Sequence, residues 1–152
     1  MPARPQKENA AQEHANECAC NKVRKAARAI TRMYDEVLRP SGLRITQFGI
    51  LGITSGLQPI TVSRLADETV TDRTTLARNL KLLEKMGLID LHTGTDRRER
   101  VVVLTKKGRE ALAKAYPFWK EAQARVMNHL GRGDWESLRD GLSAITSLAH
   151  DE

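Results

Sequence analysis

The strongest structural signal in this chain of 152 residues is the segment Asp96-Arg97-Arg98-Glu99-Arg100-Val101-Val102-Val103-Leu104-Thr105-Lys106-Lys107-Gly108. Its alternating charged and β-branched residues predict a turn that leads into a short strand. Residues 88–92 predict a second short strand, and the turn-forming residues 93–95 separate the two. Together they predict a small hairpin whose tip carries Asp96, Arg97 and Arg98.

A helix is expected directly before this hairpin and another directly after it. Residues 74–86 show the apolar periodicity of a helix. Thr105 is a candidate N-cap for the helix that follows. A helix joined to an arginine-tipped hairpin is the arrangement of a winged helix-turn-helix, in which the two elements grip DNA together. The expected fold class is therefore mainly α with a small β-hairpin wing (α+β).

The spacing Asp96-x-Arg98-x5-Leu104-Thr105-x2-Gly108 resembles, without a gap, the signature of MarR-type transcriptional regulators. The chain from about Cys20 to His150 is similar to that family in length and element order. The resemblance implies a homodimer built from the terminal helices, most often a repressor. It also implies a small aromatic or phenolic effector that binds between those helices and the winged unit.

The chain is expected to fold as a single domain, residues 17–152, after a flexible N-terminal arm, residues 1–16. The winged helix-turn-helix covers about residues 46–104, and the dimerisation helices cover about 18–38 and 105–150. Individual helices are expected at 18–38, 46–55, 62–69 with Thr61 as N-cap, 73–86 with Gly87 at its end, 105–130 with a bend at Pro117, and from Asp134 to Leu148.

The composition limits the class of protein. Hydrophobic residues make up 40 % of the chain, enough for a real core. No run of about 18 apolar residues is present, and residues 1–8 lack the apolar core of a signal peptide, so we expect a cytoplasmic protein without membrane contact. The net charge of +6 favours an anionic partner. Residues 61–100 nevertheless hold eight basic and seven acidic residues, so the positions of the charges matter more than their sum.

The helix at 73–86 has the side chains of a major-groove reader. With about 100° per residue, the face opposite Leu76 and Leu80 presents short hydroxyl groups and an arginine that can bind guanine. Arg73 suits a phosphate contact, and Arg98 suits the minor groove, with Asp96 accepting hydrogen bonds from Arg98 or from the turn. The alternatives are a solvated helix face and a charged tip that keeps the hairpin soluble. The candidate DNA-binding residues are Thr71, Arg73, Thr74, Thr75, Arg78, Lys81, Asp96, Arg97 and Arg98.

One recognition helix spans only a few base pairs, so a dimer on a two-fold, pseudo-palindromic DNA site is expected. The helices outside the winged unit carry more apolar residues than such a small domain needs. Tyr34, Phe48 and Trp119 could line the effector pocket, although core packing is the alternative for each. The candidate interface residues are Trp119, Val126, Leu130, Trp135, Leu138, Leu142 and Ile145, some of which will belong to the core.

Cys18 and Cys20 lie at the start of the first helix, where nearby basic residues favour the thiolate. They are candidates for a redox or soft-metal sensor, to which His14 could contribute a further ligand. Two residues that are two apart on a helix point about 200° from each other, which argues against an internal disulfide. Four-ligand metal spacing is absent from the sequence, so no metal site is predicted. The alternatives are that both cysteines are ordinary residues at a helix start, or that they form a contact across a dimer.

An enzyme is not expected, because the sequence offers no phosphate-binding glycine loop and no nucleophile or metal-ligand pattern. No cofactor is implied either. The sequence thus predicts a dimeric DNA-binding regulator released by a small ligand or by thiol oxidation. The competing hypotheses are a winged-helix module for protein contact and a protein that acts primarily as a thiol sensor.

Overall fold

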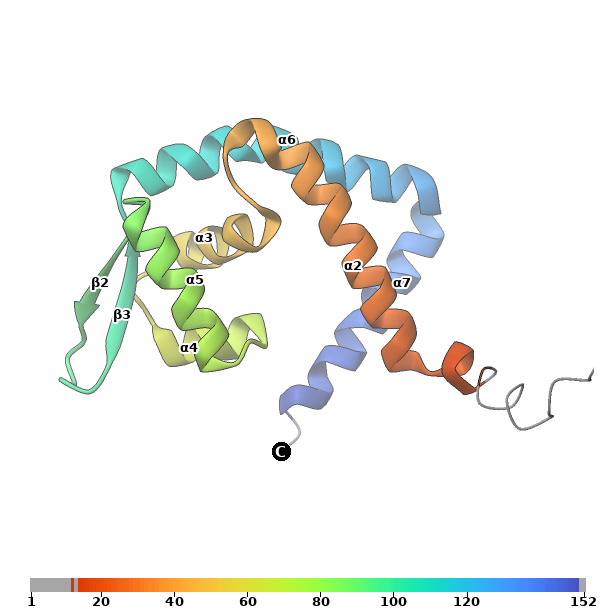
Figure 1. Ribbon diagram of the computed structural model, residues 1–152, viewed down its shortest axis with the longest axis horizontal. Coiled ribbons are helices and arrows are strands. Elements are labelled where there is room, and N and C mark those ends of the chain that lie inside the picture. The colour runs from red at the N-terminus through yellow and green to blue at the C-terminus, as the bar shows by residue number, and fades with distance from the viewer. Residues whose placement is uncertain (1–11, 13, 151–152) are drawn as a thin grey trace, which may run out of the picture.

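The computed structural model describes residues 12 and 14–150, which form a mainly helical chain with one small sheet (Figure 1). The predicted arm at 1–16 lies largely outside this range, and its residues 14–16 belong to a helical segment that extends to residue 17. No helix within the described part is long and apolar enough to cross a membrane. The elements are α2 (Ala19–Leu38), η1 (Arg39–Ser41), α3 (Ile45–Leu57), β1 (Ile60–Thr61), α4 (Val62–Thr69), α5 (Arg73–Lys85), β2 (Ile89–Thr93), β3 (Arg100–Leu104), α6 (Lys106–Leu130), α7 (Arg132–Ser147) and η2 (Leu148–His150).

The sheet is antiparallel and has the strand order β1-β3-β2. In the predicted hairpin, Leu91 of β2 faces Val102 of β3. The structure adds a strand that the sequence did not predict: Ile60 of β1 pairs with the other side of Val102. A strand of two residues has no visible alternation, so only the tertiary structure reveals it. The wing is therefore a hairpin supported by a third short strand.

The winged unit has its own core, and α5 contributes one stripe to it. Leu76, Leu80 and Leu83 are each at most 2 % exposed, as their spacing of four and three residues predicts. They lie against apolar side chains of the neighbouring helices and of the sheet. The fully buried residues in this cluster include Leu38, Leu51, Ile60, Leu65, Ile89 and Val102.

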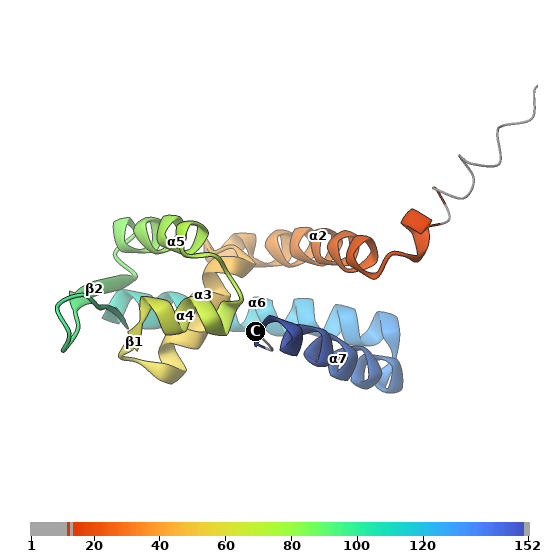
Figure 2. The ribbon, with the colours of Figure 1, turned by 90° about the horizontal axis from the view of Figure 1, so that it is seen from below.

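The other end of the molecule is far less buried. In Figure 1, α6 runs from the wing across the molecule to α7, and both α2 and α7 pack against α6. Seen from below, α2 and α5 lie along one edge and α7 along the other (Figure 2). Helix α7 has no buried residue, and α2 buries only its last turns, at Tyr34, Val37 and Leu38. The apolar residues exposed on these two helices are Val23, Ile30, Leu138, Leu142 and Ile145.

Two predicted helix boundaries differ from the structure. Helix α3 continues through Gly56 to Leu57, because an exposed glycine near a helix end weakens a helix without ending it. Helix α6 continues past Pro117, as predicted, and the bend expected at that residue stays a prediction. Helix α7 begins at Arg132, since Gly131 (φ +85°) makes the turn and serves as its N-cap, whereas Asp134 lies in the first helical turn.

Candidate nucleic-acid interface

The turn between α4 and α5 sets the angle of the candidate recognition helix. Thr61 caps α4 as predicted, with its hydroxyl oxygen accepting a hydrogen bond from the Arg64 N–H at 3.1 Å. The helix ends at Val70, whose left-handed backbone (φ +46°) is costly for a β-branched residue. Its N–H bonds to Ala66 O and Asp67 O, which holds this conformation. The Thr71 hydroxyl donates to Thr69 O at 3.0 Å, so this candidate DNA-binding side chain also stabilises the turn.

Asp72 caps α5, a role that the sequence did not predict. Its carboxylate accepts a hydrogen bond from the backbone N–H of Thr75 at 2.9 Å. The pKa of Asp72 lies below its ordinary value of 3.8, first because of a hydrogen bond from the Thr75 side chain and then because of the backbone bond. The negative charge also suits the positive end of the helix dipole. The Thr75 hydroxyl is therefore engaged at the cap.

The exposed face of α5 carries the side chains that the helical periodicity placed there. Thr74, Arg78 and Lys81 are exposed and line a shallow depression together with Arg73 and Ala77. Within the described residues, no ion pair or side-chain hydrogen bond engages Arg73, Arg78 or Lys81. Three cations and a hydroxyl are thus available to a polyanion on one helix face.

The tip of the wing is organised by Asp96. Its carboxylate accepts a hydrogen bond from the backbone N–H of Arg98 at 2.9 Å, and its carbonyl oxygen accepts from the Glu99 N–H at 2.9 Å. Of the two roles predicted for Asp96, the structure has the bond to the turn backbone. Arg97 and Arg98 are exposed. Because the carboxylate holds the backbone, the guanidinium groups remain available to a ligand.

The base of the wing explains the rest of the Leu-Thr-x2-Gly pattern. Thr105 caps α6 by accepting a hydrogen bond from the Gly108 N–H at 2.9 Å, and its hydroxyl donates to Gly87 O at 2.7 Å. A Cβ on Gly108 would lie 1.9 Å from Leu88 O, so only glycine fits against this strand. Lys107 Nζ donates to Met86 O at the end of α5 at 2.7 Å. We call these contacts between residues 86–88 and 105–108 the wing base.

The cap at Asp72 gives a pH-dependent prediction. Because its folded-state pKa is lowered, the carboxylate contributes stability above pH 3.8 and loses that contribution as the pH falls through the lower folded value. We expect the unfolding free energy of Asp72→Ala to lie below that of the wild type at neutral pH and to approach it in acid. Urea unfolding across this range measures the difference. Asp72→Asn, which keeps an uncharged cap acceptor, is the control; a gap that is the same at all pH values contradicts the assignment.

The predicted effector residues are packed together with other side chains. The rings of Phe48 and Trp119 stack with centroids 5.9 Å apart, and the rings of Tyr116 and Trp119 stack with centroids 5.6 Å apart. Tyr34 is buried and donates its hydroxyl hydrogen to Gln123 Oε1 at 2.6 Å; burial raises its pKa. None of the three predicted residues lines the cavity of about 750 Å³ found beside α2. The periodicity of a single helix could not predict that cavity, because the turn through η1 brings residues after α2 to the side of α2.

Both cysteines are exposed, and their backbone differs from the prediction of one continuous helix. Cys18 is the N-cap of α2 with an extended conformation (φ −63°, ψ 115°), between helical residues 14–17 and α2. Cys20 lies in the first turn of α2. The Cys18 carbonyl oxygen still accepts a helical hydrogen bond from the Lys22 N–H at 3.1 Å, so only the N-terminal side of Cys18 departs from helical geometry. Among the described residues, no three His, Cys, Asp or Glu side chains are grouped so as to hold a metal ion.

A capped helix pair, a helix face rich in basic and hydroxyl groups and an arginine-tipped wing define a winged-helix DNA-binding regulator. The comparisons with known proteins give the family. A MarR family model matches residues 41–99, and the HTH-type transcriptional regulator YwoH of Bacillus subtilis is 30 % identical over 94 residues, which cover 62 % of this chain and 69 % of YwoH. The chain belongs to the MarR family, and it is a DNA-binding transcriptional regulator of the MarR type.

Solved structures agree in fold. The M. tuberculosis transcriptional regulator MosR in complex with DNA is 42 % identical, with a TM-score of 0.80 over 88 % of this chain and 97 % of that one. The transcriptional repressor CouR bound to a 23-mer DNA duplex is 24 % identical, with a TM-score of 0.78 over 87 % of this chain and 94 % of that one. The likeness to CouR concerns the fold alone.

Proposed function

We propose that this protein is a homodimeric, cytoplasmic repressor that binds a pseudo-palindromic operator. Helix α5 lies in the major groove, where Arg78 binds guanine and Thr74 reads a neighbouring base. Arg98 of the wing enters the adjacent minor groove, and Arg73, Lys81 and Arg97 contact phosphates. The observation that carries the proposal is the exposed, unpaired set of basic side chains on α5, together with a wing tip that Asp96 holds through its backbone.

The exposed apolar faces of α2 and α7 support the dimer. Val23 and Ile30 on α2 are about as exposed as Leu138, Leu142 and Ile145 on α7, at 36–47 %. Two helices that keep such faces in water are poorly stable on their own, and a second copy would bury them. Trp119, Val126, Leu130 and Trp135 are half-buried within one chain, so they combine core and interface roles in this proposal.

Arg78 tests whether α5 reads sequence. An Arg78→Ala protein should lose about 1–3 kcal/mol of discrimination between its operator and random DNA, because a bidentate bond to guanine exists only on the operator. Fluorescence anisotropy on both duplexes measures this. Lys85→Ala, at the far end of the same helix, is the control. An equal loss on both duplexes would make Arg78 a phosphate contact, and no DNA binding by the wild type would favour a protein-contact module.

Release from DNA by thiol oxidation is a second part of the proposal, favoured by the extended backbone at Cys18. Peroxide would oxidise one thiol to a sulfenic acid and release water. The other thiol would then attack the sulfenic acid, forming the disulfide and releasing a second water. The disulfide would tighten the start of α2 and change how two copies pack. Release by a small aromatic effector is the other route, for which the stacked surface of Tyr116, Trp119 and Phe48 is the candidate contact.

Gel shifts with peroxide test the thiol route. Wild-type protein should lose its operator complex after peroxide treatment and regain it after reduction by a dithiol. Cys18→Ser and Cys20→Ser should each keep the complex in peroxide, since neither can form the bond. If peroxide released a serine variant from the operator as readily as it releases the wild type, the thiol route would be wrong.

A further inference from the structure

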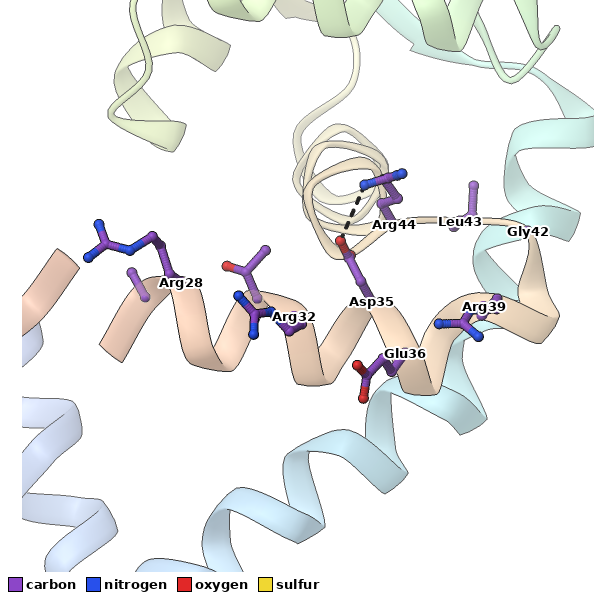
Figure 3. Close-up of a pocket in the computed structure, with 10 residues that line it drawn as sticks. Arg28, Arg32, Asp35, Glu36, Arg39, Gly42, Leu43 and Arg44 are labelled. Atoms are coloured by element: carbon purple, nitrogen blue, oxygen red, sulfur yellow. Dashed lines mark ion pairs between the residues drawn. The ribbon is translucent and has the colours of Figure 1, made fainter. Parts of the chain in front are cut away.

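A cavity of about 750 Å³ lies beside α2, outside the DNA-binding surface (Figure 3). Its walls are the second half of α2, the turn through η1 and the start of α3. Its lining includes Arg28, Arg32, Arg39 and Arg44, with Asp35 and Glu36 as the acidic members. We call it the arginine groove. Four guanidinium groups against two carboxylates give it a positive balance.

The two carboxylates do not neutralise the groove evenly. Asp35 is engaged twice: it accepts a hydrogen bond from the Ile45 N–H at 2.8 Å and pairs with Arg44 at 3.7 Å. Figure 3 shows Asp35 and Arg44 pointing toward one another, while Glu36 projects to the opposite side of the α2 ribbon. Within residues 12 and 14–150, no ion pair engages Arg28, Arg32 or Arg39. Three cations therefore lack a counter-charge.

The spacing of these cations fits a ligand with several anionic groups. Arg28 and Arg32 are one turn apart on one face of α2, and Arg39 follows about two turns later, so the row spans roughly 16 Å. The apolar face of α2, with Val23 and Ile30, lies on the other side of the helix. A second copy that covered that face would leave the arginine row open. Like charges kept this close without partners repel each other and favour an anion between them.

We propose that the arginine groove binds a small molecule that carries two or more phosphate groups, such as a nucleoside diphosphate. Guanidinium groups bind phosphate oxygens through paired hydrogen bonds, and about 750 Å³ lies within the usual range of ligand cavities. A concave site that also holds the Asp35 carboxylate suits a compact ligand with hydroxyl or amino groups better than it suits the DNA backbone. The inference depends on the proposed function only for its output, which is altered DNA binding.

Titration calorimetry on the full-length protein without DNA tests the proposal, with ADP and inorganic tripolyphosphate as probes. The wild type should bind at least one probe, and Arg28→Gln/Arg32→Gln should bind it about tenfold or more weakly. The matched control is Lys114→Gln/Arg125→Gln, which removes the same charge from exposed positions on α6 and should bind as the wild type does. Binding of ADP alone would show that the nucleoside contributes; equal binding of both probes would show that phosphate suffices.

Three results would overturn the proposal. The first is wild-type protein that binds neither probe, and the second is an equal loss in both double variants, which would mean a general effect of charge. The third is a groove variant whose main defect, without any probe, is weaker DNA binding with a smaller salt dependence, because the groove would then contact the DNA backbone. Operator binding by the wild type is measured separately, so a failure here leaves the proposed function standing.

Discussion

An Arg98→Ala protein should bind its operator roughly 10- to 100-fold more weakly than the wild type. The proposed dimer has two wings, so the substitution should remove two arginine contacts from each complex. The wing reads groove shape and charge more than base identity, and we therefore expect a similar loss on random DNA. The slope of log affinity against log salt should fall by about one for each lost contact. Anisotropy titrations over a series of sodium chloride concentrations measure both effects.

Arg125→Ala is the matched control for Arg98→Ala. Arg125 is an exposed arginine near the end of α6 that lies farthest from the wing, and it pairs with Glu121 at 2.6 Å. Its removal lowers the net charge equally and should leave the salt slope unchanged. An Arg98→Ala protein with wild-type affinity at every salt concentration would remove the wing from the proposed mechanism.

Gly108→Ala should lower the unfolding free energy by about 3 kcal/mol or more. Its Cβ would overlap the Leu88 carbonyl oxygen, a backbone atom that already accepts a hydrogen bond from the Thr105 N–H at 3.1 Å. The contact can be relieved only by moving β2 away from α6, which breaks bonds of the wing base. Thermal and urea unfolding measure the change. We also expect the variant to lose operator affinity, because the displaced strand carries the wing.

Gly56→Ala controls for the glycine-to-alanine change itself. Gly56 is exposed in α3, and a Cβ there would meet nothing within 4 Å. Alanine favours a helix, so this variant should match the wild type or exceed it by up to about 1 kcal/mol. A Gly108→Ala protein as stable as Gly56→Ala would contradict the close packing of the wing base.

Sequence patterns within single elements correctly predicted the buried helix stripe and two of the helix caps. The stripe of Leu76, Leu80 and Leu83 is buried as its period requires, and Thr61 and Thr105 cap their helices. The features that the sequence did not reveal depend on contacts between distant segments. Strand β1 exists because Ile60 meets Val102, and the cap at the start of α7 depends on the left-handed backbone that Gly131 permits.

The candidate DNA-binding site could likewise be predicted only where local sequence determines it. The outward face of α5 could be predicted because a helix that buries one stripe must expose the opposite one. The positions of Arg97 and Arg98 follow from the turn before β3. The arginine groove could not be predicted, because Arg28 and Arg44 are brought together only by the turn through η1. The stacking of Phe48 on Trp119 likewise joins α3 to α6. The pattern within a single helix therefore could not show whether these two rings belong to the core or to an effector pocket.

The wing base has a mechanical consequence. It ties the end of α5, the first residues of the hairpin and the first turn of α6 to one another, and α6 then runs for 25 residues, or about 37 Å, to the start of α7. Such a rod acts as a lever arm: a tilt of about 5° over this length displaces its end by about 3 Å. In the proposed dimer, a small change where the two subunits meet would therefore become a larger displacement of both wing tips, which would no longer match the spacing of the DNA grooves.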